Sequence, residues 1–319
     1  MALFEISTAL ALPTSTVIIG GGINNRNWAG DGPVEREEAT MQLVDVSEAP
    51  NYDVGKIRDG ELDSKHLLHG VDGSPNNYRV ALTTATTPWP APRHRHNFDQ
   101  IRFPINGAFE YTKGTTLPAG WVGYFPEGAY YGPQLRQPGL QMLVIQFGGA
   151  GGCGYLGEEE LREARGALTA RGAFVEGVFS WLDEKGKKHN KDGFEACWEE
   201  SMGRKLEYPA PRYDGQIKMN PANFEWIEDA TYQGVAHKWL GTFTERNIRM
   251  GFSRLSIGAN LAVGDHDAPE FLFLAKGSVA INDKRYGLHS AFGFEANEGP
   301  IIVEGFENSE LLRVQLPRF

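Results

Sequence analysis

Short apolar runs separated by glycine, proline and polar turns extend along most of the chain. Residues Tyr78 to Thr87 have the composition of a strand, and several more apolar runs follow a bend at Pro88-Trp89-Pro90 up to about Gly148. A second series of such runs begins at about Trp226 and ends with Leu311 to Leu316. The pattern therefore predicts two all-β units, one in each half of the chain.

The segment between the two β units has a different periodicity. Apolar residues recur at helical spacing over residues 157 to 171, whose first turn is acidic, and this pattern predicts a helix. A second helix is predicted over residues 192 to 204, and the lysine-rich run from 185 to 191 is predicted to be a charged turn. The two β units are thus expected to be joined by a short helical segment.

These boundaries divide the chain into four segments. The first, residues 1 to 75, contains turn signals such as Gly20-Gly21-Gly22 and too few apolar positions for a core of its own. We expect an N-terminal arm that either lies on a β unit or reaches another subunit. The remaining segments are a first β unit over 76 to 150, a helical linker over 151 to 225 and a second β unit over 226 to 319.

Composition narrows the choice of partner and compartment. The 319 residues suit two domains, and a formal net charge of −10 without clustered Lys and Arg argues against a nucleic-acid partner. A small molecule is the expected partner. The chain contains no apolar run of about 18 residues, so no membrane-spanning helix is predicted. Cys153 and Cys197 are expected to be reduced thiols, which indicates the cytoplasm.

The candidate chemistry is concentrated in one stretch of the first β unit. His94 and His96 are two residues apart, so on a strand both imidazoles face the same side, where their neutral nitrogens can chelate one metal ion. Gln100 and Arg102 fall on the same inward face. A buried arginine requires an anion, and Arg102 is expected to bind either a substrate carboxylate or an internal acid such as Glu110.

The spacing of these residues resembles the two sequence motifs of the cupin superfamily. The first motif has two histidines separated by one residue, then a glutamate, then a glycine. In this chain those positions are held by His94, His96, Gln100 and Gly107. The glycines and proline of the second motif match residues 120 to 128, and Tyr131 stands where the motif has its last histidine. The resemblance implies a cupin barrel whose metal site has two altered ligand positions.

These two replacements change the expected chemistry. An amide oxygen is a weaker ligand than a carboxylate, so His94, His96 and Gln100 would hold a divalent ion less tightly and leave it more electrophilic. A protonated tyrosine is a poor ligand unless a nearby cation lowers its pKa, so Tyr131 is expected to orient a substrate or a water molecule. We expect Tyr131 and Arg102 to be the catalytic residues. The expected cofactor is a divalent transition metal, with Fe(II) favoured over Mn, Ni or Zn.

The second β unit repeats the first motif with fewer ligands. His266 and Glu270 match it, whereas Gly264 replaces the first histidine and Pro300 falls at the position of the last ligand. This unit is expected to be structural. The predicted fold is therefore all-β, with two cupin double-stranded β-helix (jelly-roll) barrels and a short helical connecting segment, the second barrel having a degenerate site.

The resemblance implies several functions, because bicupins include enzymes and metal-free storage proteins. The leading hypothesis is a metal-dependent enzyme of the oxygenase type that acts on a small oxygen-rich or carboxylate-bearing molecule. The alternatives are a metal-dependent isomerase or lyase, and a metal-free cupin that binds a ligand or only supports an oligomer. Because cupin sheets commonly pair, a homodimer is expected.

Overall fold

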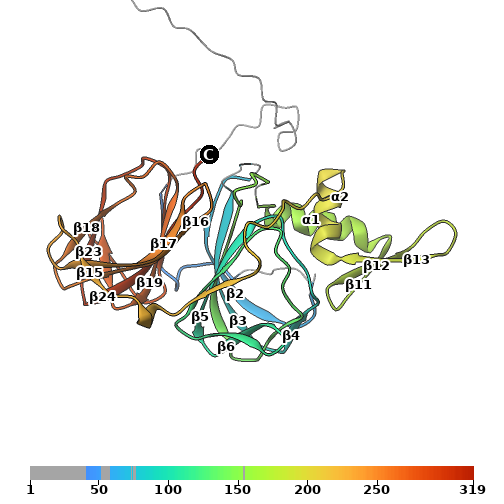
Figure 1. Cartoon of the computed structure of the whole chain (residues 1–319), viewed down its shortest axis with the longest axis horizontal. Helices are drawn as coiled ribbons and strands as arrows, with labels where there is room; N and C mark the ends of the chain where they lie inside the picture. The colour runs from blue at the N-terminus through green and yellow to red at the C-terminus, as the bar shows by residue number, and fades with distance from the viewer. Residues whose placement is uncertain (1–40, 52–57, 73, 75–76, 154) are drawn as a thin grey trace, which may run out of the picture. The chain divides into compact units, whose positions relative to one another are not determined.

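The computed structural model describes residues 41–51, 58–72, 74, 77–153 and 155–319. These residues form two β-barrels, and the chain between them forms a small connector that contains both α-helices. In Figure 1 the first barrel is mainly blue to green, the connector yellow-green to yellow, and the second barrel mainly orange to red. The predicted all-β class with two jelly-roll barrels and a short helical connection is confirmed. The part of the predicted arm before residue 41 lies outside the described residues.

The first barrel consists of two antiparallel sheets. The larger sheet contains β2 (Leu62–His69), β3 (Tyr78–Ala85), β5 (Asp99–Asn106), β8 (Val122–Phe125), β10 (Gln141–Phe147) and β14 (Ile217–Met219), in the order β14-β8-β5-β10-β3-β2. The smaller sheet contains β4 (Trp89–Ala91), β6 (Ala108–Thr112), β7 (Thr115–Pro118) and β9 (Gln134–Arg136), in the order β4-β9-β6-β7. The edge strands β2 and β14 come from the segments that the sequence assigns to the arm and the linker.

The second barrel has the same two-sheet construction. Its larger sheet contains β1 (Gln42–Val44), β15 (Ile227–Glu228), β16 (Val235–Phe243), β17 (Ile248–Leu255), β19 (Glu270–Lys276), β22 (Ala291–Phe294) and β24 (Ser309–Gln315). Its smaller sheet contains β18 (Asn260–Val263), β20 (Val279–Ile281), β21 (Lys284–Tyr286) and β23 (Ile301–Gly305). Strand β1 pairs with β22, so residues from before the first barrel complete the sheet of the second.

Alternation along β5 decides which side chains reach the inside of the first barrel. Ile101 and Phe103 point to one face, where they join a buried apolar cluster shared by both barrels. The Phe103 ring lies 5.8 Å from the Phe252 ring of the second barrel, between centroids. Gln100 and Arg102 therefore point to the opposite face, into the first barrel.

The connector is more than a pair of helices. The two predicted helices are confirmed as α1 (Glu158–Thr169) and α2 (Gly193–Met202), and between them lies a three-stranded sheet of β11 (Gly172–Val175), β12 (Val178–Leu182) and β13 (Lys188–Asp192). The predicted lysine-rich turn is the end of the β12–β13 hairpin together with β13. Asp192 caps α2, because its carboxylate accepts hydrogen bonds from the backbone N–H groups of Phe194 and Glu195.

The connector closes one end of the first barrel. Phe194 and Trp198 of α2 pack with Phe98 and Tyr155 in a buried aromatic cluster.

Neither helix in the described part of the chain has the length and apolar content that crossing a bilayer requires.

Candidate active site

The first barrel encloses a cavity of about 130 Å³ beneath the connector. Four of the five predicted site residues line it: His94, His96, Arg102 and Tyr131. The fifth, Gln100, lies behind them and donates a hydrogen bond from its Nε2 to the Tyr131 hydroxyl, at 3.0 Å. The structure thus brings all five predicted side chains together, while their roles remain predictions.

The two histidines are buried and neutral. Their ring centroids are 5.0 Å apart, and His94 is held opposite Tyr131 by two backbone hydrogen bonds of 2.9 Å. Burial lowers the pKa of His94 to about 4 and that of His96 well below its ordinary value. Because the Nδ1 of His94 lies 2.6 Å from the Pro92 carbonyl oxygen, it must carry the proton, which leaves the Nε2 lone pair available.

His96 is fixed mainly by aromatic rings. Its imidazole stacks on Phe98 at 4.5 Å and meets the edge of Phe194 at 4.7 Å, and its Nδ1 is buried without a hydrogen-bond partner. A buried nitrogen without a partner costs free energy unless a ligand satisfies it. Both histidines therefore provide nitrogen atoms that a metal ion or a ligand N–H or O–H can use.

Gln100 is already engaged in a chain of hydrogen bonds. Its Oε1 accepts from the Nη2 of Arg102 and, at 3.3 Å, from the Nε2 of Gln146. The hydroxyl of Tyr155 donates in turn to the Oε1 of Gln146, at 3.3 Å. A carbonyl oxygen has two lone pairs, so coordination of a metal by Gln100 requires that one of these donors leave.

Arginine side chains dominate the charge of the cavity. Arg58, Arg79, Arg102 and Arg136 all line it, against one lining carboxylate, that of Glu158. Arg79 pairs with Glu158, and Arg58 pairs with Asp192 at 2.9 Å.

The other two, Arg102 and Arg136, form no ion pair with any described residue. The Nε and Nη1 of Arg102 and the Nε of Arg136 are buried without a hydrogen-bond partner, and burial lowers the pKa of both groups. Arg136 donates a 3.4 Å hydrogen bond to Thr83, and its guanidinium carbon lies 4.5 Å from the centroid of the Trp89 ring and 5.7 Å from that of Phe109. Two positive charges in the cavity thus lack an acidic partner.

The internal acids that could have balanced Arg102 lie elsewhere. The carboxylate of Glu110 accepts a hydrogen bond from the backbone N–H of Gly114, at 2.7 Å. Asp99 points away from the cavity and accepts from the Tyr124 hydroxyl at 3.0 Å and from the Glu127 N–H at 2.7 Å. Burial raises the pKa of Asp99 to about 7. Of the two partners expected for Arg102, the internal acid is therefore not found.

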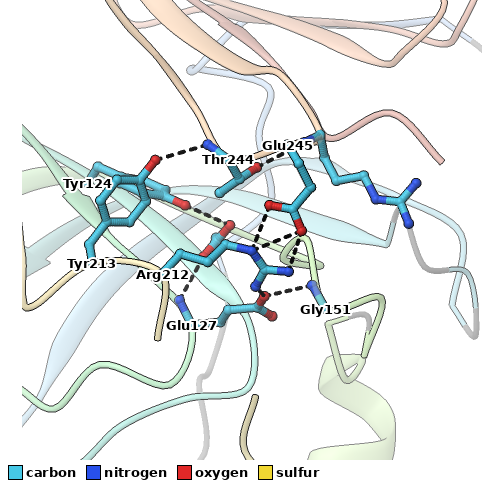
Figure 2. Close-up of polar contacts among 9 residues, drawn as sticks. Tyr124, Glu127, Gly151, Arg212, Tyr213, Thr244 and Glu245 are labelled. Carbon is cyan, nitrogen blue, oxygen red and sulfur yellow. Dashed lines mark hydrogen bonds and ion pairs between the residues drawn. The ribbon is translucent and has the colours of Figure 1, made fainter. Parts of the chain in front are cut away.

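Asp99 belongs to a separate polar network on the far side of the larger sheet. Figure 2 shows Arg212 between two glutamates: its Nη1 lies 2.6 Å from the buried Glu127, and its Nη2 lies 2.6 Å from Glu245 in the β16–β17 turn of the second barrel. The Oε1 of Glu127 also accepts from the N–H of Gly151, at 2.6 Å. This network ties the first barrel to the second.

The cavity fits a metal ion only in part. The two histidines supply neutral nitrogens, which suit first-row transition metals. No group of three or more His, Cys, Asp or Glu side chains among the described residues is arranged to hold a metal ion. Gln100 is occupied, so further ligands must come from a released Gln100 or from a bound molecule.

The second barrel has an internal ion pair at the corresponding place. The Nε of Arg313 donates to the buried Glu270, and its Nη2 lies 3.0 Å from the Nε2 of His266. The guanidinium thus contacts the two residues that match the first motif.

Several residues of the first site were not expected from the sequence, Arg136 and Gln146 among them. Arg136 and Gln146 come from β9 and β10, outside both motifs, and each is a polar residue in a mostly buried strand. Such a position is a weak signal of an inward-facing polar group.

No protein-family model and no curated protein sequence matches this chain. Solved structures do. A proposed dioxygenase of Nostoc punctiforme matches with a TM-score of 0.58 at 11% identity, over 92% of this chain and 87% of its own. Streptomyces albus HEPD, solved with its substrate 2-hydroxyethylphosphonate and Fe(II), matches with a TM-score of 0.51 at 10% identity, over 87% and 76%. A proposed glyoxylate-induced protein of Pseudomonas aeruginosa matches with a TM-score of 0.51 at 10% identity, over 91% and 94%.

At these identities the likeness shows the fold. The chain has the fold of two-barrel cupin proteins, as the resemblance of its sequence motifs implies.

Proposed function

We propose that the first barrel is the active site of a metal-dependent enzyme of the oxygenase type, and that its substrate is a small anion such as a carboxylate or a phosphonate. One observation supports this most strongly. Arg102 and Arg136 are buried beside two neutral histidines and have no acidic partner among the described residues.

The energetic argument favours an anionic ligand. Burying an ion costs several kcal/mol even after the surroundings relax, so two unpaired guanidiniums destabilise the folded chain. Such a cost is typically retained where a ligand repays it on binding. A carboxylate or phosphonate accepts paired, charge-assisted hydrogen bonds from a guanidinium, which neutral ligands cannot match. The phosphonate substrate and Fe(II) of HEPD provide a precedent on the same fold.

Each residue then has a distinct role. Arg102 and Arg136 bind and orient the anion, and the connector helices exclude water from the cavity. The Tyr131 hydroxyl accepts a hydrogen bond from Gln100, so its own proton is free to be donated to the substrate. His94 and His96 hold the metal, which would supply Lewis-acid or redox chemistry when bound. A cytoplasmic homodimer remains a prediction from composition and resemblance.

The test is elemental analysis of protein purified without added metal, combined with oxygen-consumption screening of small carboxylates and phosphonates. We expect a transition metal that is lost in the double variant His94→Ala/His96→Ala. Protein that contains no metal and takes up no added Fe(II), with or without a small anion, would overturn the metal-dependent function.

A second candidate is a metal-free cupin that binds the same anion. The hydrogen bonds from Arg102 and Gln146 to the Gln100 oxygen favour it, because they occupy one expected ligand. Anion binding without any metal uptake would support this candidate.

A further inference from the structure

Gln100 has no lone pair left for a metal ion. Arg102 and Gln146 both donate to its Oε1, while its Nε2 donates to the Tyr131 hydroxyl. Because a guanidinium can only donate, the Arg102 contact fixes which end of the amide faces the two donors. The oxygen that stands in the ligand position is thus directed at Arg102, and it cannot coordinate a cation at the same time.

Arg102 has a reason to hold this oxygen. It is buried and forms no ion pair with any described residue. Its guanidinium donates to the Gln100 oxygen and has the Tyr131 hydroxyl as a further hydrogen-bond partner. A neutral amide is a weak partner for a guanidinium. An anion in the cavity is a stronger one, because charge-assisted hydrogen bonds are roughly twice as strong as neutral ones.

We propose that Arg102 is a positioning residue that couples the binding of anion and metal. In the absence of an anion, Arg102 holds the Gln100 oxygen. A bound anion draws the guanidinium to itself, and the released oxygen joins His94 and His96 as the third ligand of the metal. This inference rests on the proposed function.

Electrostatics acts in the same direction. Without an anion, the charges of Arg102 and Arg136 repel a divalent cation, and none of the candidate ligands is a carboxylate to offset them. A bound anion reduces the repulsion between the arginines and the cation, and it also releases the Gln100 oxygen from Arg102. By linkage, the metal must strengthen anion binding by the same factor.

The experiment is calorimetric titration of the whole chain with Ni(II), a metal that imidazole binds well and that is stable in air. Titrations in sodium acetate and in sodium chloride of equal ionic strength are compared. Acetate is a small carboxylate that binds Ni(II) only weakly in solution. The variant His94→Ala/His96→Ala identifies any binding at surface histidines. We expect Ni(II) to bind the first barrel about 5- to 150-fold more tightly in acetate, the usual range for coupled sites.

The variant Arg102→Met separates release of Gln100 from simple charge repulsion. It permanently frees the lone pair of the Gln100 oxygen that Arg102 occupies, while Gln146 keeps the other. Ni(II) affinity in chloride should therefore rise to near the wild-type value in acetate, and acetate should no longer change it. Arg136→Met is the matched control, because it removes a cavity charge without touching Gln100. In chloride, Arg136→Met should raise the Ni(II) affinity less than Arg102→Met does. Adding Gln100→Leu to Arg102→Met should abolish the gain.

The outcomes are distinguishable. Equal Ni(II) affinity in acetate and chloride would overturn the coupling and leave the proposed metal site intact. A gain in Arg136→Met as large as that in Arg102→Met would overturn release of Gln100 as the cause. Absence of Ni(II) binding to wild type in both salts would overturn the inference together with the metal-dependent function. Melting curves establish that each variant is folded.

Discussion

The same substitution in the two barrels should change stability in opposite directions. Arg136 in the first barrel and Arg313 in the second are both inward-facing and almost fully buried, with 5% and 6% of their surface exposed. Arg136 has no acidic partner among the described residues, whereas Arg313 pairs with Glu270, which is completely buried. Replacing each with methionine keeps a long side chain and removes the charge.

The magnitudes follow from these partners. Arg136→Met loses the Trp89 contact, worth about 2 kcal/mol when desolvated, and a weak hydrogen bond worth about 0.5 kcal/mol. It also removes an ion whose burial costs several kcal/mol, so a net gain of about 1–2 kcal/mol is expected. Arg313→Met removes the arginine partner of the buried Glu270 carboxylate and leaves it the Gly264 N–H and the His266 ring, which should cost about 3–5 kcal/mol.

Urea unfolding in chloride buffer, followed by tryptophan fluorescence, measures both effects. The midpoint should rise for Arg136→Met and fall for Arg313→Met. Acetate or methylphosphonate should stabilise the wild type and Arg313→Met, but should stabilise Arg136→Met much less, because half of the proposed anion site is gone. Destabilisation of Arg136→Met by more than about 2 kcal/mol would refute the reasoning, since Arg136 would then be a structural residue whose charge is satisfied.

Three further predictions concern the described structure outside the cavity. Arg212→Ala should destabilise the chain by about 1–3 kcal/mol in urea unfolding, because the buried Glu127 loses its charged partner, and an unchanged midpoint would contradict this. Gly149→Ala should cost about 1–3 kcal/mol, because its Cβ would lie 2.4 Å from the Glu127 carboxylate, and Gly166→Ala, where a Cβ meets nothing within 4 Å, is the control. Cys197 should react with a thiol reagent only on unfolding, because it is fully buried and burial raises its pKa to about 12; rapid labelling of the native protein would show that α2 opens.

The sequence was sufficient to predict which side chains of β5 face the inside of the first barrel. Gln100 and Arg102 lie where period-two alternation places them, because Ile101 and Phe103 fix the register of β5. His94 and His96 precede β5 and belong to no named strand, and His94 is positioned by an isolated bridge to Tyr131. What alternation cannot give is the partner of each polar group. Gln146 meets Gln100 only because β10 pairs with β5 in one register, and that register depends on the whole sheet.

Long-range pairing also explains what was missed in the fold. Strand β1 has three residues, and its partner on β22 is about 250 residues away, so no local pattern indicates that the N-terminal segment completes the second barrel. The connector sheet was missed for a different reason, because local strand signals are present there. Phe174, Phe179 and Trp181 are typical strand residues, but the charged run after them favoured a turn.

In the second barrel the sequence shows which ligand positions are replaced, but not which residue pairs with the remaining carboxylate. The sequence shows that Gly264 and Pro300 replace two ligands. It does not show that Arg313, 43 residues after Glu270, supplies the positive charge that Glu270 needs. That contact depends on the pairing of β19 with β24.

The central claim is that the first barrel binds a small anion through Arg102 and Arg136. The most direct test is a crystal structure of the protein grown with sodium selenate, a compact dianion whose selenium is located by anomalous scattering. We predict an anomalous peak inside the first barrel, with selenate oxygens within hydrogen-bond distance of both guanidiniums. Crystals that contain selenate elsewhere but none in this cavity would contradict the claim.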